Sequence, residues 1–172
     1  MVLYQRNRVM VGTYFFTVTL HDRKSTLLSD YIELLRESVR KTRRARPFSI
    51  EAWVVLPEHL HVPPDNADYS SRWRSIKSNF SVESAKRVKI SRNTKGEYGL
   101  WQRRFWEHTI RDEMDFSRHM DYVHHNPVKH GHVKQVNEWR YSSFHRFVAK
   151  KIYPPNWGNL DDDEFCFSND GE

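Results

Sequence analysis

Cysteine and long apolar runs are almost absent from this chain. Cys166 is the single cysteine among 172 residues, which excludes an intramolecular disulfide framework and a cysteine-based zinc site. No apolar run approaches the roughly 18 residues of a membrane-spanning helix. The first residues lack the apolar segment and the small-residue cleavage site of a secretion signal. These absences predict a cytoplasmic protein with no membrane partner.

Internal repeats and long low-complexity segments are absent as well, and what remains is an ordinary globular composition. Hydrophobic residues make up 38% of the chain and charged residues 29%, so a disordered protein is excluded. The length suffices for one domain with a small elaboration and is too short for two full-sized domains.

Basic residues are missing from one end of the chain only. Residues 159–172 contain six acidic side chains and no lysine or arginine, which leaves 28 basic and 16 acidic residues elsewhere, a net charge of +12. That excess favours a polyanionic partner, nucleic acid first; a solvated basic surface is the alternative that charge alone leaves open. The acidic tail either folds over a basic groove and competes with DNA, or is only a solubilising end.

Hydrophobic periodicity predicts the order β-α-β-β-α-β followed by a further helix. Strands are expected at 13–20, 48–56, 59–62 and 105–110, and helices from Ser29 or Asp30 to Arg43, after Asp68, and from Asp112 to about Asn126. The last helix is expected to end there because Pro127 disfavours helical angles in the residue before it. The pattern is that of an α+β, ferredoxin-like split βαβ fold: an antiparallel sheet with helices on one face, plus a C-terminal helix.

The sequence His59-Leu60-His61 is the sharpest chemical feature. Residues two apart on a strand share a face, so both imidazoles project to one side while Leu60 points into the core. Two adjacent imidazoles suit a divalent metal. A structural pair of histidines is the alternative reading, although the tight Pro57-Glu58 turn before it favours a rigid site.

Tyr122 is the second feature. On the expected last helix, Phe116, Met120 and Val123 form an apolar stripe, and Tyr122 lies off that stripe. From this helix alone, a surface tyrosine that directs its hydroxyl to water is the favoured interpretation. As a nucleophile, its phenol could attack a phosphodiester that a metal polarises. Asn126 is one turn further on and offers a third ligand, with His125 as the competing candidate.

Five blocks of sequence make the chain resemble the REP-associated tyrosine transposases, within the HUH single-tyrosine transposases. The resemblance covers roughly residues 10 to 148. The blocks are Leu56-Pro57-Glu58-His59-Leu60-His61, Trp73-Arg74-Ser75-Ile76-Lys77-Ser78-Asn79-Phe80, Trp101-Gln102-Arg103-Arg104-Phe105-Trp106-Glu107-His108, Tyr122-Val123-His124-His125-Asn126-Pro127-Val128 and Trp139-Arg140-Tyr141-Ser142-Ser143-Phe144. Pro63-Pro64 departs from the family pattern, in which apolar residues continue the strand.

The resemblance implies a DNA transposase, a site-specific endonuclease and strand transferase that cuts single-stranded DNA beside short palindromic hairpins. Tyr122 would be the nucleophile and form a 5′-phosphotyrosine link. His59, His61 and Asn126 would hold Mg²⁺ or Mn²⁺. Residues 1–148 would form the nuclease domain and 149–172 a C-terminal extension with an acidic tail. A monomer is expected, with a homodimer as the alternative.

Basic residues near the expected second helix and fourth strand are candidate phosphate contacts: Arg72, Arg74, Lys77, Arg103 and Arg104. Solvated side chains are the alternative for each. Other functions remain open at this stage. They are a hairpin-binding regulator that does not cut, a basic RNA-binding module, and a zinc cluster among the five histidines between His119 and His132.

Overall fold

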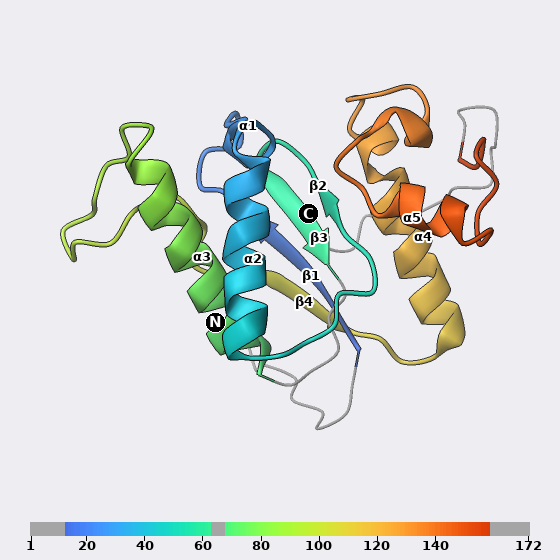
Figure 1. Ribbon diagram of the computed structural model, residues 1–172, viewed down its shortest axis with the longest axis horizontal. Coiled ribbons are helices and arrows are strands. Elements are labelled where there is room, and N and C mark those ends of the chain that lie inside the picture. The colour runs from blue at the N-terminus through green and yellow to red at the C-terminus, as the bar shows by residue number, and fades with distance from the viewer. Residues whose placement is uncertain (1–12, 63–67, 159–172) are drawn as a thin grey trace, which may run out of the picture.

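A four-stranded antiparallel sheet lies between two helical layers (Figure 1). The computed structural model describes residues 13–62 and 68–158. The elements are β1 (Tyr14–Thr19), α1 (Leu27–Asp30), α2 (Ile32–Ala45), β2 (Val54–Val55), β3 (His59–Val62), α3 (Tyr69–Ala85), β4 (Trp106–Thr109), α4 (Glu113–Lys129), the 3-10 helix η1 (Val136–Glu138) and α5 (Phe144–Ala149). The strand order β2-β3-β1-β4 confirms the predicted ferredoxin-like α+β arrangement.

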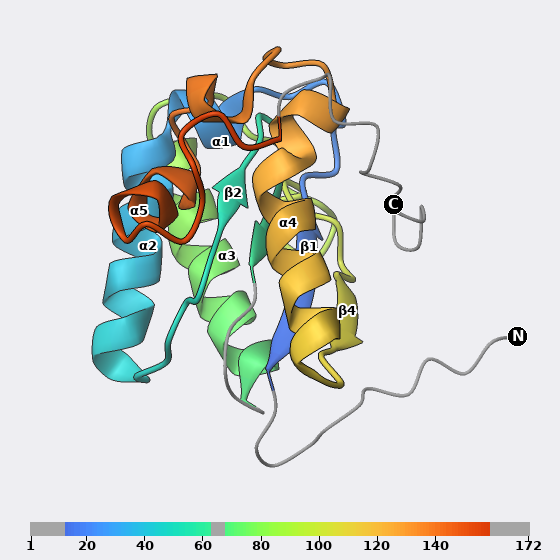
Figure 2. The ribbon, with the colours of Figure 1, turned by 90° about the vertical axis from the view of Figure 1, so that its right-hand side faces the viewer.

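Alternation along β1 divides the protein into two cores. Its even-numbered residues, such as Phe16, pack with α2 and α3 on one face of the sheet. Its odd-numbered residue Phe15 packs with Met120 and Val123 of α4 on the other face. Figure 2 shows α4 and α5 on the near side of the molecule, with α4 in front of the sheet, and α2 and α3 behind it. Leu60 lies in the α2–α3 core, as predicted, so the histidines on either side of it face α4.

The strand predicted at 48–56 is wrong over most of its length, because only Val54 and Val55 form β2. Residues of the C-terminal half cover this edge of the sheet. The Val55 amide donates to the Tyr141 carbonyl at 2.9 Å, and the Ser143 amide donates to the Trp53 carbonyl at 2.8 Å. The apolar alternation of this segment therefore reflects contact with a distant segment rather than a full strand.

Helix α4 continues through Pro127 to Lys129, so its predicted end at Asn126 is corrected. Pro127 lacks an amide hydrogen, but the last turn is closed by other donors: the His130 amide bonds to the Asn126 carbonyl at 3.0 Å and the His132 amide to the Pro127 carbonyl at 2.9 Å. Gly131 ends the helix with φ of 70°, in the left-handed region that glycine adopts without a steric penalty. The extra turn keeps Asn126 in helical geometry.

A third small core anchors the segment after α4. Phe144 packs with Val128, Val136 and the rings of Tyr153 and Trp157. The Tyr153 hydroxyl donates to the Asp121 carboxylate at 2.5 Å. Trp139 donates its indole N–H to the Val55 carbonyl at 2.9 Å, which shows that this aromatic segment closes the core.

Among the residues that the structure describes, no helix has the length and apolarity to cross a membrane. The acidic tail at 159–172 and Pro63-Pro64 lie outside the described residues. The domain boundary at residue 148 stays a prediction.

Candidate active site

Strand β3 presents His59 and His61 side by side toward α4. The strand pairs with β1 in the register Thr17 with His61 and Thr19 with His59. The two imidazole rings are 4.9 Å apart between centroids, and their exposed fractions are 1% and 0%. The sequence pattern therefore placed the pair correctly on one face, and that face is buried under a helix.

Both histidines are oriented by a hydrogen bond at Nδ1. The Nδ1 of His61 is hydrogen-bonded to the Thr17 hydroxyl at 2.9 Å. The Nδ1–H of His59 donates to the Glu58 carboxylate at 2.8 Å, and that carboxylate also faces the Arg23 guanidinium at 4.0 Å. Such partners fix the ring orientation and the tautomer, so the Nε2 atoms are left for a ligand.

Charge and burial keep His61 neutral. Burial is the largest cause that lowers the pKa of His61 well below its usual range, and the electrostatic effects of its neighbours His59, His130 and Lys129 add to it. Burial works to raise the pKa of Glu58, but its hydrogen bond to His59, a backbone hydrogen bond and the electrostatic effects of His59 and Arg23 together outweigh this and lower it. A neutral imidazole beside an ionised carboxylate is the state in which histidine binds metals.

Helix α4 places Tyr122 and Asn126 against the histidine pair. The Tyr122 ring lies 5.3 Å from the His61 ring and 5.8 Å from Phe15. Asn126, one turn later, is fully buried, and its amide lies close enough to His61 to raise the pKa of that imidazole against the effects of burial. The polar face of this helix is therefore turned to the sheet rather than to solvent.

Three buried polar atoms at this point have no partner of good hydrogen-bond geometry in the described part of the chain. They are Nε2 of His61 and both amide atoms of Asn126. Buried polar atoms without partners are costly, so they point to a ligand. An imidazole nitrogen beside an amide oxygen, with His59 adjacent, is a donor set that fits a divalent ion such as Mn²⁺.

Lys129 and His130 also reach the site, and the sequence interpretation did not include them. The Lys129 ammonium donates to the Tyr122 hydroxyl at 3.4 Å and lies 4.9 Å from the centre of its ring. The His130 ring is 5.0 Å from His59. Seven residues are two turns of a helix, so the spacing of Lys129 from Tyr122 was a usable signal; the expected helix end at Asn126 concealed it.

A cavity of about 250 Å³ opens beside His59 between β1 and the chain that leads into β4. Its walls combine the cationic side chains of Arg23 and Arg104 with the aromatic rings of Phe105 and Trp106. Cationic and aromatic groups together are what a single-stranded nucleic acid requires for its phosphates and bases.

The five basic residues predicted to contact phosphates are not gathered in one place. Arg103 and Arg104 are exposed just before β4, and Arg104 lines the cavity. The alternative of a solvated side chain is wrong for Arg72, which lies on the buried side of α3. Arg72 is 8% exposed, and its guanidinium donates to the Pro47 carbonyl at 2.8 Å.

Arg74 and Lys77 stand on α3, on the face of the sheet opposite α4. Arg74 is exposed. Lys77 donates to the Gln102 carbonyl at 3.0 Å and lies 5.5 Å from the centre of the Phe105 ring. Burial lowers the pKa of Lys77 to about 8. Lys77 thus holds the segment that contains Gln102 and Phe105, which lines the cavity, from the α3 side of the sheet.

The histidines between 119 and 132 point in different directions. His125, the alternative ligand, faces the Trp157 ring at 6.5 Å and is not brought to the His59–His61 pair. His124 is buried and bonded to the Ser143 hydroxyl at 2.8 Å, and His132 packs on Trp139. The five residues therefore do not form one zinc cluster.

Comparisons with known proteins identify relatives of this chain. The chain is similar to a REP-associated tyrosine transposase of Escherichia coli, with 47% identity over 158 residues that cover 90% of this chain and 89% of the relative. A Haemophilus influenzae relative, described as a putative REP-associated tyrosine transposase, is 41% identical over 166 residues, 92% of this chain and 94% of that one.

A solved structure of a REP-associated tyrosine transposase bound to a REP hairpin superimposes with a TM-score of 0.86 and 43% identity, over 100% of this chain and 98% of that chain. No family model matches the chain.

Proposed function

This chain belongs to the REP-associated tyrosine transposases, and on this premise we propose that it cuts and rejoins single-stranded DNA beside REP hairpins with Tyr122 as the nucleophile. One observation carries the proposal: Tyr122 lies 5.3 Å from His61, ring to ring, over a buried site that also holds His59 and Asn126. A tyrosine with only a structural role would not account for the buried polar atoms of His61 and Asn126 beside it that lack partners.

The reaction balances with Tyr122 alone as the covalent group. The phenolic oxygen forms a bond to the scissile phosphorus, and the bond from phosphorus to the 3′ oxygen breaks. The phenolic proton leaves, the 3′ oxygen takes up a proton, and the products are a 5′-phosphotyrosine and a free 3′-OH. The reverse attack by a 3′-OH rejoins a strand without further energy, because the phosphotyrosine stores the bond.

Lys129 assists at the phenol. Its ammonium lies 3.4 Å from the Tyr122 hydroxyl, so it stabilises the negative charge that develops there as the proton leaves. The same side chain covers the ring face and fixes the direction in which the hydroxyl points.

His59, His61 and Asn126 would hold the divalent ion, Mg²⁺ or Mn²⁺. Bound there, the ion would polarise the scissile phosphate and offset its charge. Glu58 and Thr17 hold the two imidazoles at Nδ1 so that each Nε2 is available. Burial of both rings under α4 excludes bulk water from the ligand atoms.

The strand to be cut would enter through the cavity beside His59. Arg104 and Arg23 supply positive charge at its rim, and Phe105 and Trp106 supply faces on which bases stack. Arg103, exposed beside Arg104, extends the same basic edge. Arg74 would contact only DNA that extends to the α3 side of the sheet.

The experiment that tests the proposal uses a labelled single strand carrying a REP hairpin with its flanking sequence, Mn²⁺ and a denaturing gel. The parent protein should give a covalent protein–DNA band and a shortened strand. Tyr122→Phe should abolish both and retain hairpin binding, since only the nucleophilic oxygen is removed.

Tyr98→Phe is the matched control. Tyr98 accepts a hydrogen bond from Arg92 at 2.8 Å in the loop after α3, and its substitution should leave the covalent band unchanged. Cutting by Tyr122→Phe at the parental rate would eliminate the mechanism. Hairpin binding without cutting by the parent protein would favour a regulator instead.

A further inference from the structure

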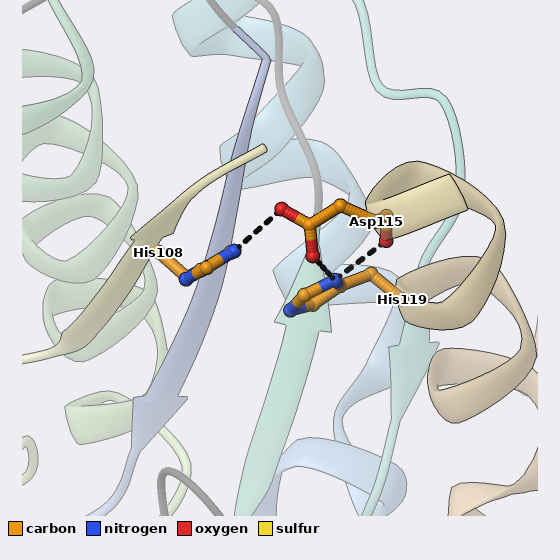
Figure 3. A group of neighbouring side chains, drawn as sticks. All are labelled: His108, Asp115 and His119. Carbon is orange, nitrogen blue, oxygen red and sulfur yellow. Dashed lines mark hydrogen bonds and ion pairs between the residues drawn. The ribbon is translucent and has the colours of Figure 1, made fainter. Parts of the chain in front are cut away.

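A second group of side chains of the types that bind metals lies between β4 and the start of α4. Its last member, His119, is about one turn before Tyr122. His108 comes from β4, and Asp115 and His119 come from the first turns of α4. Their candidate ligand atoms all lie within 4.8 Å of one another. Figure 3 shows both imidazoles turned toward the two oxygens of the one carboxylate.

The distances are close to those of a metal site. Nε2 of His108 is 2.8 Å from one Asp115 carboxylate oxygen, and Nδ1 of His119 is 3.1 Å from the other and 2.8 Å from the Asp115 backbone carbonyl. A tetrahedral Zn²⁺ with bonds near 2.0–2.2 Å sets its donor atoms roughly 3.3 Å apart. An ion therefore fits between these groups after shifts of a few tenths of an ångström in the pairs that now touch.

The chemical state of the group also suits an ion. Partial burial works to raise the pKa of Asp115, but hydrogen bonds from His108 and from the Arg111 amide, together with the electrostatic effects of His108 and His119, outweigh it and lower the pKa to about 2. Burial lowers the pKa of His119. An ionised carboxylate and a neutral imidazole are the forms that bind metals.

A plain hydrogen-bonded contact explains the group less completely. One histidine would suffice to tie Asp115 to β4, yet two stack with their rings 4.6 Å apart and 13° from parallel. The side chains of His108 and His119 remain 25% and 19% exposed, so an ion has access and water can complete its coordination.

We infer that His108, Asp115 and His119 form a second metal site, distinct from the His59–His61 site, that binds a first-row divalent ion such as Zn²⁺. Two imidazoles and a carboxylate are a donor set typical of such ions. On binding, the proton that each imidazole directs at Asp115 would move to the other ring nitrogen, and the ion would replace the hydrogen bonds that His108 Nε2 and His119 Nδ1 now make to Asp115.

An ion at this site would fix the start of α4 to the sheet. His108 pairs in register with Phe15 on β1, and Phe15 contacts His119 at 4.8 Å and Tyr122 at 5.8 Å. The tie would therefore set the distance of the Tyr122 helix from β1. These three residues would act as positioning residues, through the backbone of α4 and the Phe15 ring.

The test is isothermal titration of the full chain with Zn²⁺ alone, in a His59→Ala/His61→Ala background that removes the first site. We expect one equivalent of zinc to bind, and zinc to raise the melting temperature of this variant. Adding either His108→Gln or His119→Gln should weaken zinc binding by more than about 100-fold. Loss of a residue that only hydrogen-bonds to a metal ligand already lowers metal affinity by about 10–100-fold.

His145→Gln is the matched control, because His145 is exposed on α5 and its loss should leave the equivalent of zinc in place. Circular dichroism establishes that each variant is folded. Anomalous diffraction at the zinc edge, on crystals of the parent protein, should give a peak between His108 and His119.

The inference is overturned if the background variant binds no zinc, if zinc binding survives His119→Gln, or if the anomalous peak lies elsewhere. These outcomes are independent of cutting by Tyr122, because zinc binding is read without DNA.

Discussion

Lys129 has the most direct contact with the proposed nucleophile. It is placed two helical turns after Tyr122 and donates to its hydroxyl. Lys129→Met should lower the single-turnover cutting rate by about 100-fold, the effect of removing one donor from a developing anion. The deficit should shrink as pH rises, since hydroxide then removes the phenolic proton unaided. Rapid-quench kinetics across pH measure both effects.

Lys134→Met is the control for that change, because Lys134 is exposed beyond the end of α4. Hairpin affinity should change little in either variant. An equal loss of cutting in both would mean that Lys129 acts through general charge only.

His124 makes the stability of the fold depend on pH. Burial lowers its pKa to about 3, whereas an unfolded histidine titrates near 6.5. Between these values the unfolded chain binds more protons, so the free energy of unfolding falls as pH drops through this window. From pH 7 to 5 this one residue should cost roughly 2 kcal/mol.

Urea unfolding at each pH measures this loss. Between pH 7 and 5, the free energy of unfolding of His124→Gln should fall by roughly 2 kcal/mol less than that of the parent protein. Other buried histidines such as His61 contribute equally to both proteins. Parallel pH profiles of the two proteins would contradict the assignment.

At the scale of elements, α4 decides the site. It carries Tyr122, Asn126 and Lys129, and its last turn exists only because bonds after Pro127 close it. Sequence rules predicted the beginning of this helix at Asp112 correctly and its end wrongly, since the bias before a proline is a local preference that capping can override.

The N-terminal cap of α4 gives a prediction at this scale. The Asp112 carboxylate accepts a hydrogen bond from the Asp115 amide at 2.8 Å. Asp112→Ala should lower the free energy of unfolding by about 1 kcal/mol and increase hydrogen exchange in the first turn of α4. Glu113→Ala, an exposed neighbour, is the control and should cost less. No difference between the two would contradict the capping role.

At the scale of the whole molecule, basic residues lie on both faces of the sheet. Arg104 lines the cavity on the α4 side, and Arg74 is exposed on the α3 side. If the strand enters beside His59, Arg104→Gln should weaken hairpin binding and reduce the slope of log affinity against log salt by about 0.7 to 0.9. Arg74→Gln should change the slope less. Fluorescence anisotropy over a salt series distinguishes them.

The two halves of the site meet within one chain, since β3 and α4 of the same molecule bring His61 and Tyr122 together. We therefore expect each subunit to use its own tyrosine. Tyr122→Phe mixed with His61→Ala should form no covalent DNA adduct, although each variant still binds the hairpin. Recovery of cutting in the mixture would instead indicate exchange of helices between two subunits.

The sequence by itself determined what is local. The period of two in a strand put His59 and His61 on one face, and the alternation of elements predicted the sheet. Only the tertiary structure decided which polar groups meet. The way α4 crosses β3 brings Asn126, Lys129 and His130 to the histidine pair and turns His125 away, and packing against Pro47 and Phe48 buries Arg72. Contacts between distant segments depend on how the faces of helices and strands pack together. The periodicity of the sequence does not carry this information.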